Sequence, residues 1–133
     1  MSQENVEIVR RIYDVVNVAG LGGVDDYLHP EAEVVPPPIW PEGSTLRGRE
    51  QVREFARQWM ETFEDFKVEP ERYLDAGREG VVVYVRDRGR IKGSPTEIDN
   101  RLIHVWTLTS GKVMRWQLFT DEDQALEAAG LRE

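Results

Sequence analysis

The sequence predicts an α+β domain in which helices come first and an antiparallel sheet follows. Apolar residues recur at helical spacing in the first half of the chain, and from residue 66 onward they form strand-like runs between glycine-bearing turns. Helices followed by a run of strands are typical of this class. A chain of 133 residues is long enough for one core and too short for two, so we expect a single domain over residues 1–133.

Three helices are predicted before the sheet. The first can be capped by Ser2 and ends before Gly20. A short second helix is expected over residues 24–28, and a third begins near Gly48. The apolar face of the first helix consists of Val6, Val9, Tyr13 and Val16. The apolar stripe of the third consists of Val52, Phe55, Ala56, Trp59 and Phe63.

A proline run interrupts the chain between the second and third helices. Pro36, Pro37 and Pro38 cannot donate to a sheet ladder, so a central strand is excluded there. We therefore expect residues 33–40 to form an edge segment. The loop that follows, through Pro41 and Gly43 to Gly48, is the best candidate for a lid or rim.

Four strands and a terminal helix complete the predicted domain. The helix has Asp121 and Gln124 at capping-box spacing and Gly130 as its stop. The strands are expected at Phe66–Leu74, Gly80–Ile91, Glu97–Thr109 and Lys112–Thr120, with the helix at Asp121–Ala129.

The strand that contains residues 102–106 is apolar on both faces. An antiparallel strand usually keeps one face in water, so two dry faces indicate that one closes an internal space and the other meets more protein. We interpret the second face as a homodimer interface. Association of two subunits should then reduce the exposed area of Ile103, Val105 and Phe119.

The turn at residues 109–112 determines which side chains meet. Ser110-Gly111 lacks the Asn or Asp that favours a two-residue type I′ turn, so we expect a three-residue loop with a bulge. That register pairs even-numbered positions with even-numbered positions and places Trp116 and Leu118 on the face of His104. The expected pairs are His104 with Trp116, Leu102 with Leu118 and Trp106 with Met114.

Composition excludes several classes of partner. Seventeen basic and 25 acidic residues leave a formal charge of −8, which repels nucleic acid and anionic membranes. The chain has no cysteine, no signal-like segment and no apolar run that could span a bilayer. We expect a cytoplasmic protein. His29 and His104 lie far apart without neighbouring metal-type ligands, and no phosphate-binding glycine loop occurs, so neither a metal nor a cofactor is expected.

One polar pair stands out on the expected pocket face, His104 with Asp87. A carboxylate beside the imidazole would set its tautomer and raise its pKa, which suits a general acid or base. Packing of His104 in the core, and a solvated charge run for Asp87 within residues 86–90, explain the same residues without chemistry. The candidate ligand-binding residues are Tyr13, Trp59, Phe63, Tyr84, Asn100, Leu102, Trp116 and Leu118.

The run His104-Val105-Trp106, the segment Gly111-Lys112-Val113 and Trp116 with Asp121 resemble the SnoaL-like polyketide cyclase branch of the nuclear-transport-factor-2-like superfamily. The likeness extends from Glu4-Asn5-Val6 and Asn17 to residues 125–130. It implies a cone-shaped barrel in which helices pack on a curved sheet. A small apolar ligand, cofactor-free chemistry and a homodimer are further implications.

The same resemblance assigns roles to single positions. His104 matches the histidine that SnoaL-type cyclases carry on the penultimate strand, while Leu118 stands where they have an acid. Pro36 replaces the general base of ketosteroid isomerase relatives. Asp87 falls near one aspartate of the limonene-epoxide-hydrolase relatives, whose arginine is replaced here by Val85.

Three interpretations follow from the sequence. The chain is a small-molecule lyase, isomerase or cyclase that uses His104 with Asp87, or a non-catalytic binding domain for an apolar ligand. Alternatively, it is a structural dimer whose pocket is filled by its own side chains. An open cavity that reaches both polar residues is required by the first interpretation alone.

Overall fold

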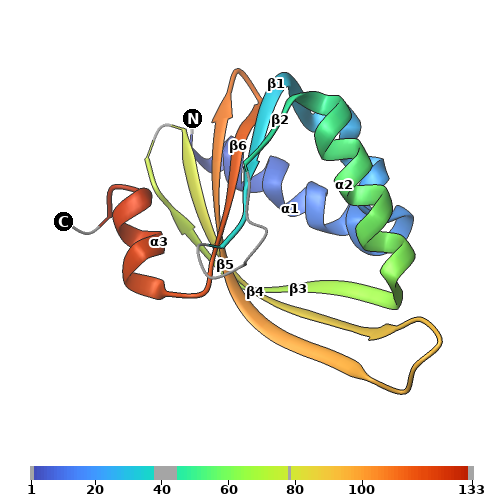
Figure 1. The fold of residues 1–133 in the computed structure, drawn as a ribbon. Coiled ribbons are helices and arrows are strands. Elements are labelled where there is room, and N and C mark those ends of the chain that lie inside the picture. Colours follow the sequence, from blue (N-terminus) through green and yellow to red (C-terminus); the bar gives the residue numbers. More distant parts are fainter. Residues whose placement is uncertain (1, 38–44, 78, 132–133) are drawn as a thin grey trace.

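Two long helices lie on one face of a curved six-stranded sheet, and a short helix lies on the other (Figure 1). The computed structural model describes residues 2–37, 45–77 and 79–131. The elements in chain order are α1 (Ser2–Ala19), the 3₁₀-helix η1 (Leu21–Tyr27), β1 (Leu28–Val35), β2 (Leu46–Arg47), α2 (Gly48–Thr62), β3 (Phe63–Asp75), β4 (Gly80–Ile91), β5 (Glu97–Thr109), β6 (Lys112–Phe119) and α3 (Glu122–Ala128).

The predicted α+β class is confirmed, and the predicted number of N-terminal helices is wrong. Within the described residues, two α-helices precede the main sheet, and the expected second helix is a 3₁₀-helix that ends at Tyr27. Its sequence contains Gly22-Gly23, and glycine costs about 1 kcal/mol relative to alanine in an α-helix interior.

The sheet has the order β2-β1-β6-β5-β4-β3 and is mixed. β1 runs parallel to β6, whereas the other neighbours are antiparallel. β1 is therefore not the edge strand that we expected, because β2 pairs with its outer side at Val34 and Leu46. The proline run follows the end of β1 and does not interrupt its pairing. Residues 38–40 of the predicted edge segment, and residues 41–44 of the candidate lid, lie outside the described residues.

The main core lies between the sheet and the two long helices. The buried positions of β4 illustrate it, since Val81 and Val83 have no exposed surface and belong to one cluster with Val9 and Ile12 of α1. Each such side chain stabilises the fold by about 1.5–3 kcal/mol relative to its exposed state. The sheet is open, with β2 and β3 at its edges, so the expected barrel does not close.

The second dry face of β5 is covered by the chain's own terminal helix. Ile103 and Val105 are 8% and 2% exposed and form a smaller core with Val82 and with Ala125 of α3. Phe119 packs against the same cluster. Ile103 and Val105 have little area left to lose, so the prediction that they become buried in a subunit interface is wrong, because α3 covers them instead. Helix α3 begins as predicted, with the Asp121 carboxylate accepting a hydrogen bond from the Gln124 N–H.

The β5–β6 connection is a two-residue turn, contrary to the expected three-residue loop. Ser110 and Gly111 both have positive φ, 52° and 78°, as a type I′ turn requires. A bulge then follows, because Leu108 pairs with Val113 while Thr107 pairs with Arg115, which leaves Met114 as the extra residue.

The expected strand register is therefore wrong by two residues, while the expected faces are confirmed. His104 lies opposite Leu118, and Trp106 lies opposite Trp116. The extra residue of the bulge restores the pairing of even with even positions. His104, Trp116 and Leu118 consequently share the face that looks toward the helices.

Asn17 attaches the end of α1 to the edge strand β3. Its side-chain amide donates to the Val68 carbonyl at 2.8 Å, and its side-chain oxygen accepts from the Val68 N–H at 2.8 Å. The pair imitates one rung of a sheet ladder and holds the helix that carries Tyr13 over the sheet.

Asn17→Ala is expected to lower the free energy of unfolding by about 2 kcal/mol, because it removes two hydrogen bonds and leaves partly buried backbone groups unpaired. Urea denaturation measures the change. Val18→Ala is the matched control, since Val18 is 89% exposed and should show no loss. Equal stability of Asn17→Ala and Val18→Ala would contradict the role of Asn17.

Candidate functional site

Two adjoining chambers lie between the helices and the sheet. We call the first the inner chamber and the second the acid chamber, because Asp87 lines the second; each has a volume of about 30 Å³. The inner chamber is lined by Ile12, Tyr13, Val16, Val24, Leu28, Val52, Phe55, Ala56, Val68, His104, Trp106 and Trp116. The acid chamber is lined by Phe55, Trp59, Phe66, Val68, Asp87, Leu102, His104, Trp116 and Leu118.

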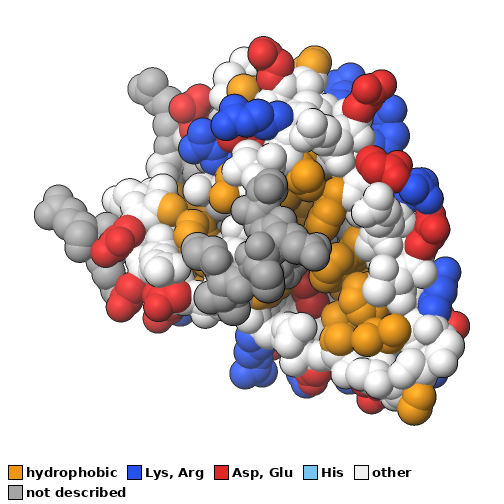
Figure 2. All heavy atoms as spheres, viewed as in Figure 1, with side chains coloured by type: hydrophobic (Ala, Val, Ile, Leu, Met, Phe, Trp, Pro, Cys, Tyr) orange, Lys and Arg blue, Asp and Glu red, His pale blue; other side chains and the backbone are white. Residues whose placement is uncertain are grey.

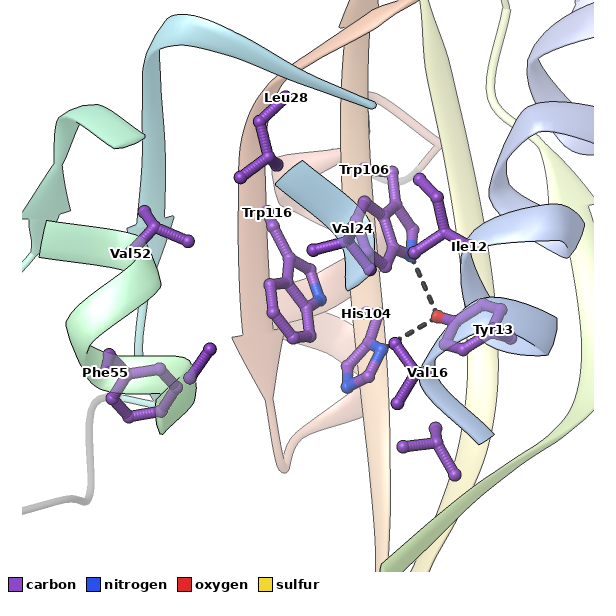
Figure 3. A pocket seen from close by; sticks show the side chains of 12 residues that line it. Ile12, Tyr13, Val16, Val24, Leu28, Val52, Phe55, His104, Trp106 and Trp116 are labelled. Atoms are coloured by element: carbon purple, nitrogen blue, oxygen red, sulfur yellow. Dashed lines mark hydrogen bonds between the residues drawn. The ribbon is translucent and has the colours of Figure 1, made fainter. Parts of the chain in front are cut away.

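His104 and Trp116 lie in the wall that the two chambers share. Their rings meet edge to face with centroids 5.2 Å apart, and Trp116 stacks on Trp106 at 4.9 Å (Figure 3). Phe55 approaches from α2 on the opposite side of the space. Figure 2 shows hydrophobic side chains gathered between α2 and the sheet, with charged side chains around them.

A buried hydrogen-bonded chain holds the imidazole of His104. Its Nδ1 lies 2.8 Å from the Tyr13 hydroxyl, and the Trp106 indole N–H donates to the same hydroxyl at 2.8 Å (Figure 3). Tyr13 projects from α1 and is 2% exposed. Burial raises its pKa well above 10, so the hydroxyl keeps its hydrogen at neutral pH.

Asp87 is buried because it alternates with three arginines along β4. Arg86, Arg88 and Arg90 point to the outer face and pair with acidic residues of the neighbouring strands. Asp87 points the other way and is 6% exposed. The interpretation of residues 86–90 as a uniformly solvated charge run is therefore wrong for Asp87.

Burial changes the proton affinity of both candidate residues. Desolvation raises the pKa of Asp87 to about 7, because its charged form loses water without gaining a cation. Desolvation lowers the pKa of His104 to about 3. The expectation that a carboxylate raises the His104 pKa is wrong, since Tyr13 and not Asp87 is the partner of its Nδ1.

The two residues line one chamber but lie well apart along the sheet. His104 lies opposite Val83, and Asp87 lies four residues further along β4, about 13 Å of extended strand. Val85 and Leu102 form the layer between them. Asp87 and His104 are thus two ends of a space rather than a hydrogen-bonded pair.

Within the described residues, three buried side-chain polar atoms have no hydrogen-bond partner, namely Asp87 Oδ1, His104 Nε2 and Trp116 Nε1. All three residues line the acid chamber. An unpaired buried polar atom costs about 1–3 kcal/mol, so the fold carries a penalty that a bound polar molecule would relieve.

Most of the predicted lining residues reach a chamber, and three do not. Tyr13, Trp59, Leu102, Trp116 and Leu118 line one or both. Phe63 lies behind Trp59, with ring centroids 4.9 Å apart. Tyr84 is on the outer face, where its hydroxyl donates to Glu122 at 2.6 Å. Asn100 is exposed on the hairpin of β4 and β5 that extends beyond the helices (Figure 1).

Sequence reasoning found Trp59 of α2 but missed Phe55 of the same helix and the contribution of the 3₁₀-helix to the site. Phe55 lines both chambers, whereas the sequence placed it only in the core, although its position on an apolar stripe beside Trp59 indicates the same direction. Val24 and Leu28 close the inner chamber from η1 and β1. Nothing in their local sequence indicates this position, because the path of η1 determines it.

The described part of the chain contains no group of three His, Cys, Asp or Glu side chains that could hold a metal ion. None of its helices has the length and apolar character needed to cross a membrane. The chemistry that the arrangement can support is proton transfer by Asp87 and hydrogen-bond donation by neutral His104 and Trp116.

The fold and the two chambers define a helix-covered curved sheet with an internal, mostly apolar site. The family model of the SnoaL-like domain matches residues 9–116, and this chain belongs to that family. None of the curated proteins compared with the chain matches it.

Solved structures with the same fold cover nearly the whole chain. A putative SnoaL-like polyketide cyclase from Jannaschia sp. CCS1 is 25% identical, with a TM-score of 0.77 over 94% of its length and 98% of this chain. A protein with a ketosteroid isomerase-like fold from Catenulispora acidiphila DSM 44928, in complex with trimethylamine, is 21% identical, with a TM-score of 0.75 and coverage of 93% of its chain and 94% of this one. TerC, co-crystallised with polyporic acid, is 22% identical, with a TM-score of 0.75 and coverage of 98% of its chain and 96% of this one.

Proposed function

We propose that this chain binds a small, largely apolar carbonyl compound and transfers a proton to or from it, with Asp87 as the proton-transferring group. The observation that carries the proposal is that unpaired polar atoms of Asp87, His104 and Trp116 belong to one otherwise apolar chamber. Relatives named as a polyketide cyclase, or bound to trimethylamine or polyporic acid, support a small-molecule ligand.

Asp87 is the better candidate for the proton carrier. A general base works best with a pKa near the operating pH, and burial brings the pKa of Asp87 to about 7. His104, with a pKa lowered to about 3, stays neutral and acts as a hydrogen-bond donor. This assignment replaces the histidine-centred transfer that the sequence suggested.

In the proposed reaction, Asp87 removes a proton from a carbon next to the carbonyl group. The electron pair moves to the carbonyl oxygen, and the developing negative charge is stabilised by donors at the other end of the chamber. Where a double bond is conjugated with the enolate, Asp87 returns the proton to the far carbon of the dienolate, and the net result is an isomerisation. Where the enolate carbon instead attacks a second carbonyl of the same molecule, a ring closes and Asp87 returns the proton to the new alkoxide oxygen.

A second candidate is a non-catalytic module whose pocket is filled by its own side chains. The observation in its favour is the chamber volume of about 30 Å³, which is far below the several hundred Å³ of typical ligand pockets. A ligand larger than a few atoms requires some of the lining side chains to move. Homodimerisation and a cytoplasmic location stay predictions.

Deuterium exchange tests the proposal without knowledge of the natural substrate. A series of ketones from acetone to cyclohexanone is incubated with the protein in D₂O, and loss of the α-proton signals is followed by NMR. We expect the protein to accelerate exchange, and Asp87→Asn to lower the acceleration at least about 100-fold.

Asp99→Asn is the matched control, because Asp99 lies on the outer face and pairs with Arg86. It should retain the exchange rate of the unmodified protein. Absence of any acceleration across the series, or full activity of Asp87→Asn, would refute proton transfer by Asp87. The first result would leave the self-filled module as the better description.

A further inference from the structure

The hydrogen-bonded chain at His104 can be satisfied fully in only one direction. The Trp106 indole nitrogen is a donor only, so the Tyr13 oxygen accepts its hydrogen. The hydrogen of the Tyr13 hydroxyl then requires an acceptor of its own. His104 Nδ1, at 2.8 Å, is the acceptor within reach. A neutral imidazole that accepts at Nδ1 carries its hydrogen on Nε2.

We propose that Trp106 and Tyr13 hold His104 in the Nε2–H tautomer, so that the wall of the acid chamber presents two N–H donors, on His104 and Trp116, and selects a carbonyl, enolate or phenolate oxygen over an amine. This inference rests on the proposed function for its substrate class. Tyr13 acts as a positioning residue, because it reaches the ligand only through His104.

The two donors have no competing partner in the described chain. His104 is 1% exposed, and both Nε2 and the Trp116 indole nitrogen are buried and unpaired. The two rings meet edge to face with centroids 5.2 Å apart, and both residues line the acid chamber. An oxygen with two lone pairs can accept from both of them.

A protonated amine fits this wall poorly. It has no lone pair to offer, and at neutral pH a simple alkylamine is protonated. The opposite tautomer of His104 would reverse the preference, because an unprotonated Nε2 would accept a hydrogen from the ligand. The direction of the Tyr13 hydroxyl therefore determines which ligand group the wall recognises.

The tautomer can be measured directly by ¹⁵N NMR of histidine-labelled protein, since long-range proton correlations distinguish the two ring nitrogens. The chain has two histidines, and His29→Asn assigns the signals. We expect the Nε2–H pattern at His104, and loss of that single pattern in Tyr13→Phe. Tyr73→Phe is the matched control, because Tyr73 packs edge-on against Tyr13 and should leave the pattern unchanged.

Ligand selectivity is measured with cyclohexanone and methylenecyclohexane, which differ only in replacing the oxygen by a CH₂ group, and with trimethylammonium. We expect cyclohexanone to bind at least about 10-fold more tightly than the hydrocarbon, because one or two hydrogen bonds contribute a binding free energy of that size. Tyr13→Phe should reduce that ratio, whereas Tyr73→Phe should retain it.

An Nδ1–H tautomer in the unmodified protein, or equal binding of ketone and hydrocarbon, would overturn the inference. Tighter binding of trimethylammonium than of cyclohexanone would also overturn it when measured in Asp87→Asn, where no carboxylate in the acid chamber attracts the cation. The tautomer result stands even if Tyr13→Phe fails to fold, since it is read in the unmodified protein. Ketone selectivity with the expected tautomer but without deuterium exchange would refute proton transfer alone. Exchange with the wrong tautomer would refute only this inference.

Discussion

Asp87→Asn is expected to stabilise the fold by about 4 kcal/mol at pH 8 while it abolishes proton transfer. The pKa of Asp87 is about 7 in the folded protein, against an ordinary value of 3.8 for an aspartate in water. That difference corresponds to about 4 kcal/mol, at about 1.4 kcal/mol for each tenfold change in proton affinity. Asparagine has nearly the same shape and never carries the charge.

The sign of this stability change depends on whether the folded or the unfolded state binds the Asp87 proton more tightly. The folded state holds the Asp87 proton more strongly than the unfolded state, so the contribution of Asp87 to stability is greatest below pH 3.8 and is lost as the pH rises through 7. The gain from Asp87→Asn should accordingly vanish near pH 4. Urea denaturation at pH 4, 6 and 8 measures it.

Asp99→Asn serves as the control for the stability measurement as well. The Arg86 guanidinium beside Asp99 lowers the pKa of that exposed carboxyl, the opposite direction from Asp87. Its replacement should therefore give no gain at high pH. A loss of stability in Asp87→Asn at pH 8 would mean that the carboxylate is favourably solvated or paired, and that its burial carries no penalty.

In the Asp87→Asn background, acid is expected to destabilise the protein through His104 by about 2 kcal/mol between pH 6.5 and 4.5. Burial lowers the folded-state pKa of His104 to about 3, against an ordinary value of 6.5. The unfolded state then binds the proton first, so stability is lost as the pH falls below 6.5. Each unit of pH accounts for about 1.4 kcal/mol once the pH is well below the unfolded-state pKa, and for less near it.

The Asp87→Asn background is needed because Asp87 and His104 change the free energy of unfolding in opposite directions over the same range of pH. In the unmodified protein, the two contributions largely cancel between pH 6.5 and 4.5. Adding His104→Gln to Asp87→Asn should remove the acid-dependent loss, whatever constant cost the lost ring packing brings. An unchanged slope in the double variant would show that other groups cause the acid sensitivity.

The class of the fold and most of the polar site could be predicted because they depend on short-range patterns. Helical spacing located α1 and α2, and alternation placed His104 and Trp116 on one face. The alternation of Val83, Val85 and Asp87 agrees with the position on the pocket face that we predicted for Asp87. The three arginines that surround it were the reason for the alternative, a solvated charge run.

The remaining features depend on long-range geometry that no local pattern carries. Tyr13 and His104 are 91 positions apart in sequence, and their hydrogen bond requires the particular angle at which α1 crosses the sheet. Tyr84 was expected in the pocket because it is aromatic, although its position in β4 alternates with inward-facing valines. The second dry face of β5 was correctly recognised, but a partner subunit and the chain's own α3 produce the same apolar pattern.

The extra residue at the Met114 bulge determines which face of β6 lines the site. A two-residue turn alone would pair odd with even positions, and the side of β6 that faces the helices would then carry Arg115 and Gln117 in place of Trp116 and Leu118. Deletion of Met114 itself would remove the bulge and leave Trp116 opposite Trp106, so only loss of the bulge at unchanged length would bring Arg115 and Gln117 into the interior. Homologues that keep this hairpin length but lack the bulge should therefore differ in what they bind more sharply than their overall similarity suggests.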